Sequence, residues 1–474
     1  MEYPQFVGGS YVAQTPNAAN AFTMNWYVER VGLPGATTPQ VLVPTPGVTR
    51  LETATSSPGR GRLTYKGRAF AVIGTQFGEI AKNGTFTVIG TVAIDTNPAT
   101  ICTNGDGGGQ LFVTSGDHGY IYDLTAATFT EVRTSATTMG AHLDGYFIAL
   151  DVATSTIFLS ALLDGTIWDP TQYAQRSIRP DPWVSMIVHD RYLWLHGQET
   201  SDVWYNQGTF PFPFAPHPSG LMPYGCAAPF SPQVVDGAVM WLAQTAQGSG
   251  DVVRASGFVP EVVSTPALQA QLADLTLSDA IGDTYEDLGH SFYVLTLPTA
   301  GLTPVYDTST QLWCDRGTWV PAQMRFTAWR PLYHLFAFDK HLMLDRQTGD
   351  IWHLSATIHT DVDGSAVRRV RRAPDLWREN ARLTVPRFEV YLEPGLGLTS
   401  GQGSDPQVSL RISPNHGKTW RAERLRSAGA RGHYDTRVRW LRNGSGRSWQ
   451  PEIVATDPIP WRITGAGVEV SVTR

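Results

Sequence analysis

The chain has 474 residues, of which 42% are hydrophobic and 16% are charged, and its formal net charge is −6. This composition excludes a disordered chain, and the apolar runs are of strand length, which excludes a helix that spans a membrane. The 46 Gly, 32 Pro, 15 Trp, 17 Tyr and 19 Phe residues predict many turns and an all-β fold.

The first segment, residues 1–55, is rich in Pro, Thr and Gly and carries few charges. It predicts an extended N-terminal arm that contains one strand able to close a ring of sheets. No basic stretch followed by an apolar stretch marks a signal peptide. We therefore expect the protein to be assembled in the compartment where it is made.

Seven units of short strands separated by Gly or Asp-Gly turns follow between residues 62 and 355. The period of about 42 residues is typical of four-stranded β-propeller blades. We predict a propeller of about seven irregular blades over residues 56–360. The aromatic residue near the end of each unit, such as Trp168, Trp204 or Trp352, is expected to fill the wedge between neighbouring blades.

A helical insertion is expected near residues 264–288, between the fifth and sixth units. In the stretch "STPALQAQLADL", Ser264 or Thr265 can cap a helix and Pro266 suits its first turn. The following stretch "LSDAIGDTYEDLG" is interpreted as a second helix.

Residues 361–474 are predicted to form an arginine-rich connector and a C-terminal β domain. The alternating stretches "RFEVYLEPG", "QVSLRIS" and "GVEVSVT" indicate half-buried strands of a β-sandwich. Residues 367–450 hold 17 basic and 7 acidic residues, whereas the remainder holds 19 basic and 35 acidic residues. The two parts therefore have electrostatic fields of opposite sign.

The connector contains four arginines close together, Arg368, Arg369, Arg371 and Arg372. Lysine is nearly absent there and no aromatic platform is interleaved, so contact with protein is favoured over contact with nucleic acid. Nucleic-acid binding remains the alternative, and it predicts an affinity that falls steeply with salt.

Residue patterns that carry catalysis are missing from the sequence. No H-E-x-x-H, G-x-S-x-G or P-loop pattern occurs. Cys102, Cys226 and Cys314 are too far apart in sequence for a zinc pattern and are expected to be reduced and buried. We expect no cofactor, no metal ion and no enzymatic activity.

One turn pattern is specific. The stretch "SPNHGKTW", residues 413–420, resembles the Asp-box of sialidases with Asn415 in the aspartate position. In this hairpin turn we expect side chains to bond the turn backbone and Trp420 to pack beneath it. The pattern indicates a fold and not hydrolysis.

A longer block is still more specific: "DVWYNQGTFPFPFAPHPSGLMPYGCAAPF", residues 202–230. With "WLA" and "VSTPAL" it closely resembles the packaged-DNA stabilisation proteins, also called tail nozzle or tail hub proteins, of short-tailed bacteriophages. The matching positions are Val203 to Asn206, Gly208, Phe212 to Phe214, Tyr224 to Pro229, Ser231, Trp241 to Ala243, Ser264 and Thr265. The stretches at residues 25–48 and 306–313 are also similar to that family.

The resemblance implies a virion protein of the tail, assembled in the host cytoplasm, without catalytic activity. Similar proteins form a ring, usually a hexamer, below the portal and its adaptor ring, extend the DNA channel and help to retain the packaged genome. The implied partners are other copies of the chain, the adaptor, tailspikes or fibres, a plug or needle, and transiently the genome. The alternative hypothesis is a carbohydrate-binding or sialidase-like propeller that acts on host surface glycans.

The candidate residues are therefore structural or located at interfaces. They are Trp204, Tyr205, Phe212, Phe214, Tyr224, Cys226, the four connector arginines and Trp420. Because DNA must slide through the channel, we expect acidic and neutral side chains to line it and the basic C-terminal part to face protein partners.

The phenylalanines and the cysteine of the 202–230 block give a first prediction. Cys226→Ala should preserve assembly, because we interpret this cysteine as a small buried filler and not as a nucleophile. Phe212→Asp or Phe214→Asp should disrupt assembly, because each places a carboxylate where apolar packing is expected. Particle assembly with each variant measures this; loss of assembly in Cys226→Ala contradicts it.

Overall fold

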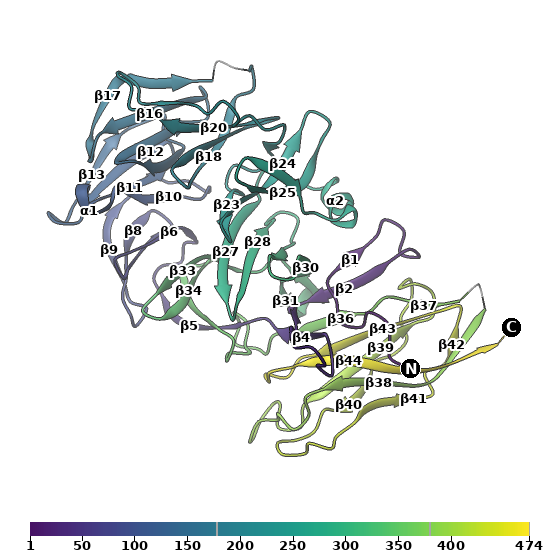
Figure 1. Cartoon of the computed structure of the whole chain (residues 1–474). Coiled ribbons are helices and arrows are strands. Elements are labelled where there is room, and N and C mark those ends of the chain that lie inside the picture. Colours follow the sequence, from purple (N-terminus) through teal and green to yellow (C-terminus); the bar gives the residue numbers. More distant parts are fainter. Residues whose placement is uncertain (177–178, 379–380, 474) are drawn as a thin grey trace.

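The computed structural model describes residues 1–176, 179–378 and 381–473, and it folds into a β-propeller joined to a β-sandwich (Figure 1). Helices are few among these residues. They are α1 (Gly105–Gly108), α2 (Pro266–Leu272) and the 3-10 helix η1 (Pro321–Gln323). The predicted all-β class, a propeller with a sandwich, is confirmed.

The described chain forms seven propeller blades, of which six are separate sheets and the sixth, β27 to β30, is part of the sheet that continues into the sandwich. The first blade consists of β6 (Gly59–Tyr65), β7 (Arg68–Ile73), β8 (Gln76–Ile80) and β9 (Phe86–Thr91), and the second of β10 (Thr100–Thr103), β11 (Gln110–Ser115), β12 (His118–Asp123) and β13 (Thr128–Arg133). The third blade consists of β14 (Met139–Leu143), β15 (Tyr146–Asp151), β16 (Thr156–Ala161) and β17 (Asp164–Gln175). The fourth consists of β18 (Trp183–His189), β19 (Tyr192–Gly197), β20 (Ser201–Asn206) and β21 (Phe214–Pro216).

The last three blades are less regular. The fifth blade consists of β22 (Gly225–Cys226), β23 (Gln233–Val235), β24 (Ala238–Thr245), β25 (Gly248–Ser256) and β26 (Val259–Val262). The sixth consists of β27 (Ile281–Asp287), β28 (His290–Thr296), β29 (Pro304–Asp307) and β30 (Leu312–Asp315). The seventh consists of β33 (Pro331–Ala337), β34 (Lys340–Asp345) and β35 (Asp350–Ser355) together with β5 (Gly47–Thr53). A small hairpin, β31 (Thr318–Val320) and β32 (Arg325–Thr327), precedes the seventh blade.

The blades form a closed ring. First strands contact one another in the first four blades and from the sixth to the seventh, and the fifth blade contacts its neighbours through β22 and β23. Strand β33 of the seventh blade contacts β6 of the first. The N-terminal strand β5 pairs antiparallel with β35 and is the outer strand of the seventh blade. The chain thereby closes the ring with its own N-terminal region, and the second strand of a blade, such as β11, is buried along its whole length.

The helix prediction is half right. α2 is present, and its cap is Thr265, whose Oγ1 accepts a hydrogen bond from the Leu268 amide at 3.3 Å. The second expected helix is wrong, because residues 281–287 form strand β27. Seven residue pairs join β27 to β28, so pairing within the sixth blade outweighs the local helical preference.

The sandwich consists of two sheets that include strands from both ends of the chain. One sheet holds β3 (Trp26–Arg30), β4 (Gln40–Pro44), β38 (Arg382–Leu392), β41 (Val438–Leu441), β42 (Ser445–Gly446) and β44 (Ile463–Thr473). The other holds β2 (Asn20–Met24), β36 (Arg369–Arg372), β37 (Leu376–Trp377), β39 (Gln407–Ser413), β40 (Arg424–Ser427) and β43 (Ser448–Ala455), with β1 (Tyr11–Val12) paired to β2.

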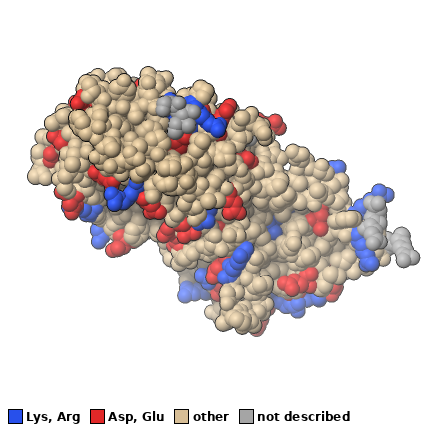
Figure 2. All heavy atoms as spheres, turned by 45° about the horizontal axis from the view of Figure 1, so that its top comes forward, with Lys and Arg blue, Asp and Glu red and all other residues tan. Residues whose placement is uncertain are grey.

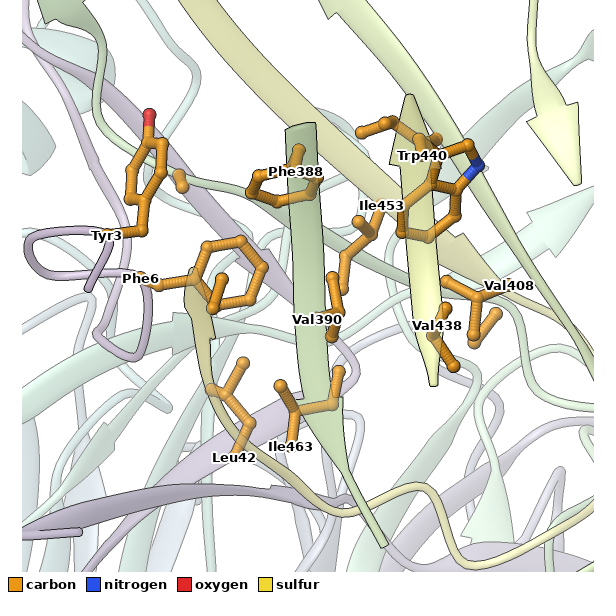
Figure 3. Close-up of a cluster of buried hydrophobic side chains, with 14 of the residues drawn as sticks. Tyr3, Phe6, Leu42, Phe388, Val390, Val408, Val438, Trp440, Ile453 and Ile463 are labelled. Carbon is orange, nitrogen blue, oxygen red and sulfur yellow. The ribbon is translucent and has the colours of Figure 1, made fainter. Parts of the chain in front are cut away.

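Residues 1–55, expected as an extended arm, are built into both domains. Tyr3 and Phe6 lie in the sandwich core beside Phe388, with ring centroids 6.0 and 5.9 Å from that of Phe388 (Figure 3). Strand β2 lies between β30 of the sixth blade and β36 of the sandwich, so one sheet runs from the propeller into the sandwich.

The place of Phe6 in the core predicts a stability effect. Phe6→Ala should lower the free energy of unfolding by about 3–5 kcal/mol, because it removes a large side chain that is 2% exposed. Chemical denaturation followed by tryptophan fluorescence measures this. The matched control is Phe210→Ala, which truncates a side chain that is 92% exposed and should change little; equal effects of the two variants contradict the placement.

Candidate functional site

The 202–230 block belongs to the fourth and fifth blades and packs in two directions. Trp204 on β20 is buried and contacts Trp183 edge to face at 5.5 Å between ring centroids. Phe214 on β21 is buried against Tyr146 of the third blade, with centroids 5.9 Å apart, and Phe212 packs on Phe214. These aromatic side chains hold the fourth blade to the third.

The exposed member of this run is Phe210, a residue that sequence reasoning missed. It is 92% exposed in the loop that connects β20 and β21, whereas Phe212 is half-buried. The sequence held one signal for this loop, because glycine at position 208 is typical of tight turns. In the structure Gly208 has a positive φ of 67° and lies in the turn beside Phe210. Tyr205 is also half-buried, with its ring 5.6 Å from that of His217.

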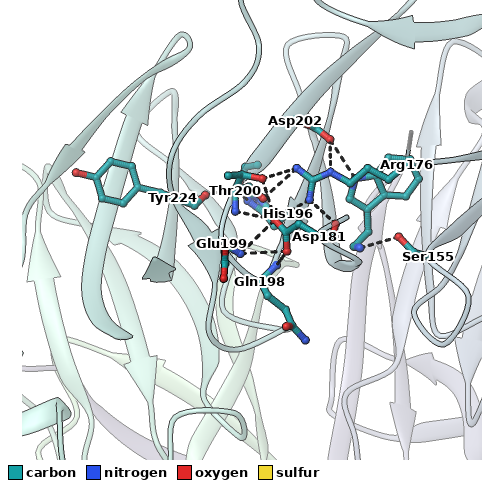
Figure 4. A network of polar contacts seen from close by, with 11 residues as sticks. Ser155, Arg176, Asp181, His196, Gln198, Glu199, Thr200, Asp202 and Tyr224 are labelled. Atoms are coloured by element: carbon teal, nitrogen blue, oxygen red, sulfur yellow. Dashed lines mark hydrogen bonds and ion pairs between the residues drawn. The ribbon is translucent and has the colours of Figure 1, made fainter. Parts of the chain in front are cut away.

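A buried polar network lies behind the block (Figure 4). The guanidinium of Arg176 contacts Asp181 and Asp202, each at 2.8 Å, and all three side chains are almost fully covered. Burial alone would raise the pKa of Asp181, but hydrogen bonds from Thr200 and the charge of Arg176 outweigh it and lower that pKa. Asp181 also accepts hydrogen bonds from the backbone amides of residues 198–200, so the network fixes the loop between β19 and β20.

His196 and Ser201 extend this network towards the "YGC" segment. The Ser201 hydroxyl donates to the Tyr224 carbonyl at 2.5 Å and lies 2.8 Å from His196 Nδ1. Burial, together with Arg176, lowers the pKa of His196 to about 3, so this imidazole is neutral. Because the hydroxyl has one hydrogen and uses it on Tyr224, His196 Nδ1 carries the proton and donates to Ser201.

Gly225 is required by close backbone approach. A Cβ at this position would lie 2.3 Å from the carbonyl carbon and oxygen of Gln198, in the loop that Asp181 holds. The Gly225 carbonyl accepts a hydrogen bond from the Trp241 indole at 2.9 Å. The half-buried Tyr224 side chain packs beside Trp241 in the core between the fourth and fifth blades.

Cys226 is a buried thiol, 3% exposed, and its S–H donates to the Ala228 carbonyl at 2.9 Å. Burial raises the pKa of this thiol to about 11. The thiolate needed for nucleophilic attack is therefore scarce at neutral pH.

Two of the four connector arginines point into the protein. Arg371 on β36 is 1% exposed, and its guanidinium donates to acceptors of the N-terminal segment. These acceptors are the carbonyls of Gln5, Phe6 and Gly9 at 3.0, 2.7 and 3.1 Å, and the Thr23 hydroxyl at 2.7 Å. Burial lowers the pKa of Arg371 to about 10, which leaves it charged at neutral pH.

Arg369, also on β36, is fully buried and donates to the carbonyls of Val367 and Thr45 at 3.2 and 3.4 Å. Burial, reinforced by the nearby charge of Arg316, lowers its pKa to about 9. The connector is thus an internal joint, in which both guanidiniums are solvated by backbone carbonyls of the N-terminal region and of the connector itself.

The other two connector arginines lie over aromatic rings. Arg368 lies 4.4 Å above the Trp319 ring, and Arg372 lies 5.0 Å from the ring of Trp420. Arg372 and Arg411 both pair with the buried Glu452, at 2.8 and 2.5 Å, and Arg411 also contacts Trp420. The structure therefore brings Trp420 together with one connector arginine, far in sequence from the 202–230 block.

The Asp-box-like turn forms between β39 and β40 of the sandwich. Ser413 Oγ accepts from the Gly417 amide at 2.8 Å, and Asn415 Oδ1 accepts from the Thr419 amide at 2.9 Å. Gly417 has a φ of 81°. The side chains of the motif thus stabilise the turn itself.

A cavity of about 250 Å³ lies where the seven blades meet. First strands of the blades line it, and it is flanked by a 2.6 Å ion pair between Arg62 of the first blade and Asp283 of the sixth. Within the described residues, no group of three or more His, Cys, Asp or Glu side chains is placed to hold a metal ion. In the same part of the chain no helix is long and apolar enough to cross a membrane.

Two family models match the chain, one for each domain. The model described as "Bacteriophage P22 Gp10, beta-propeller" matches residues 8–359, and the model described as "Bacteriophage P22 Gp10, beta-sandwich" matches residues 368–471. No curated protein matches the chain.

Solved structures with a similar fold include streptogramin B lyase, at 11% identity and a TM-score of 0.44, covering 70% of this chain and 98% of that one. Virginiamycin B lyase from Staphylococcus aureus is 10% identical with a TM-score of 0.42, covering 64% of this chain and 98% of that one. The N-terminal domain of Nup159 is 10% identical with a TM-score of 0.41, covering 71% and 99%. Likenesses this distant carry no functional argument.

The close approach at Gly225 gives a prediction. Gly225→Ala should lower the free energy of unfolding by at least about 1–3 kcal/mol, because the new methyl group displaces the loop that the Arg176–Asp181 pair fixes. Gly32→Ala is the matched control, since a Cβ there meets nothing within 4 Å. Thermal unfolding compares the two, and a wild-type midpoint for Gly225→Ala argues against the contact.

Proposed function

Because the chain belongs to the bacteriophage P22 Gp10 family of phage tail proteins, we propose that it is the subunit of a ring in the tail, below the portal and its adaptor. This ring extends the DNA channel, helps to retain the packaged genome, and carries docking surfaces for tailspikes or fibres and for a plug or needle. The observation that carries the proposal is the order of the two family matches, which together span residues 8–359 and 368–471.

The size of the central cavity supports a ring of several copies. The cavity on the propeller axis has a volume of about 250 Å³, and residues of all seven blades line it. A DNA duplex, whose major groove alone is about 12 Å wide, cannot pass along that axis. The channel for the genome therefore has to be enclosed between copies of the chain, with each propeller as part of its wall.

The joint between the two domains suits such a wall. One sheet runs from the sixth blade through β2 into the sandwich, and Arg369 and Arg371 are buried at that joint. A sheet that continues across a domain boundary resists bending there, because a hinge would have to break ladder hydrogen bonds. The subunit is accordingly proposed to act as a stiff wedge and not as a moving gate.

The buried connector also bears on contact with DNA. Arg369 and Arg371 make their hydrogen bonds inside their own chain, so they are not free to grip phosphates. This agrees with the proposal that acidic and neutral side chains line the channel, where a genome must slide. The proposed role is mechanical and needs no catalytic group.

The mass of the assembly tests the proposal. Native mass spectrometry of the purified chain, alone and after mixing with the portal and adaptor, should give a defined multiple of the 51.9 kDa chain on the adaptor. Six copies is the number that the family resemblance implies. Binding of a single copy, or no binding to the adaptor, contradicts a ring.

A further inference from the structure

One edge of the sandwich carries a dense group of arginines. Strands β40 and β41 are the edge strands of the two sandwich sheets, and they contact each other. Five arginines lie on or beside them, and we call this group the arginine edge: Arg421, Arg424, Arg426, Arg439 and Arg442.

These guanidiniums are oriented but not neutralised. Arg424 Nη1 donates to the Leu441 carbonyl at 3.0 Å, and Arg426 Nε donates to the Arg439 carbonyl at 3.1 Å. Within the described residues none of the five forms an ion pair with a carboxylate, although Arg437 close by pairs with Glu389. Burial and the like charges of Arg426 and Arg421 lower the pKa of Arg424. The three positive charges therefore repel one another in the folded chain.

Apolar side chains stand between the arginines. Leu425 on β40 is 57% exposed and Leu441 on β41 is 54% exposed. A phosphate backbone has no partner for exposed leucines, whereas a protein surface can cover them. The arginine edge therefore fits an acidic protein surface with apolar residues of its own.

The propeller of the same chain has such a surface. In each blade, the turn between the first two strands and the turn between the last two lie at the same end. Contacts between neighbouring blades place these ends together: Tyr65 bonds Asp106, Asn104 bonds the Leu163 carbonyl, Asp144 pairs with Arg191, and His189 contacts the Gly237 carbonyl. These turns make up one face of the propeller.

Exposed carboxylates recur on this face, and we call it the acidic face. Its exposed acids are Asp106, Asp190, Asp236, Glu286 and Asp339, and the same turns carry the exposed bases Lys66, Lys82 and Arg191. Asp106 pairs with Lys66 and Asp236 with Arg254, whereas Glu286 and Asp339 form no ion pair within the described residues. Aspartate is favoured at such turns because it tolerates positive φ, which is 48° at both Asp190 and Asp236 and 58° at Asp339.

The acidic face also carries apolar side chains. Phe210 is 92% exposed and Leu288 is 69% exposed, and both lie in turns of this face. Leu162, in the last turn of the third blade, is 57% exposed.

Charge separates the two domains as a whole. Residues 56–360 hold 27 acidic and 15 basic residues, whereas residues 361–474 hold 12 acidic and 19 basic residues. Figure 2 shows that side chains of both signs are present on both domains, so the separation is one of net charge. Two copies of the chain would therefore attract each other when the sandwich of one approaches the propeller of the other.

From these observations we propose that the arginine edge of one copy docks on the acidic face of the next, a head-to-tail contact that rests on the proposed ring. Because the two surfaces differ, the contact is heterologous and can be repeated around a ring until it closes. The charges guide the approach and select the partner surface, and Phe210, Leu425 and Leu441 are the apolar side chains that become covered.

Charge reversal at exposed positions tests the contact. Arg426→Glu with Arg439→Glu should reduce ring formation on the portal and adaptor at least tenfold, measured by native mass spectrometry at low salt. Wild-type ring formation should also weaken as salt rises from 50 to 500 mM, because surface charges become screened at about these concentrations. Arg325→Glu, which reverses an exposed arginine on hairpin β31–β32, is the matched control and should assemble as the wild type does.

A charge swap makes the test specific. Asp190→Lys with Glu286→Lys should reduce ring formation on its own. A chain that carries both pairs of changes should recover most of the wild-type yield, because opposite charges again face each other. Thermal unfolding of each purified variant shows whether the fold is intact, and rescue by the swap cannot come from a misfolded chain.

The outcomes separate this contact from the ring itself. A wild-type ring that is unchanged by the arginine reversal overturns the head-to-tail contact and leaves the ring standing. If the wild-type chain forms no ring on the adaptor, the proposed function fails as well. If the reversal spares the ring but removes binding to duplex DNA, the arginine edge is a nucleic-acid surface and the inference is wrong.

Discussion

Strand β2 between β30 and β36 is the contact on which the rest of the structure depends. Its residues pair with the sandwich strand β36 and touch the last strand of the sixth blade, so neither domain is complete without the first 53 residues of the chain. The same segment supplies Tyr3 and Phe6 to the sandwich core and β5 to the seventh blade. The same N-terminal segment thus takes part both in closing the propeller and in joining it to the sandwich.

The arginines at this joint show how a charge can be buried without a carboxylate. Arg371 uses its planar set of donors on four acceptors of the N-terminal segment, each at 3.1 Å or less. A lysine has a single ammonium group and cannot reach acceptors spread over the same plane. Arginine therefore suits the two buried connector positions, Arg369 and Arg371, better than lysine would.

A different principle shapes the surfaces. Tight turns at one end of the blades favour aspartate for backbone reasons, and the repetition of the blade repeats the carboxylate around that face. At the far end of the chain, β40 and β41 protect exposed sheet edges with arginine, which keeps unpaired backbone groups from pairing at random. The charge difference between the domains is therefore explained in part by aspartates at the propeller turns and by arginines on the sandwich edge strands.

The β-propeller and the sandwich could be predicted from the sequence by itself, because period-2 alternation and a regular spacing of turns are local patterns of consecutive residues. The sequence also predicted that the 202–230 block is packed; in the structure Trp204 and Phe214 are buried, whereas Phe210 is 92% exposed. The path of residues 1–55, the strand at residues 281–287 and the inward direction of Arg369 and Arg371 were decided only by tertiary structure. The path of residues 1–55 and the direction of the two arginines depend on partners about three hundred or more positions away, which no local pattern encodes. The strand at residues 281–287 pairs with the adjacent strand β28, and this pairing within the sixth blade outweighs the local helical preference.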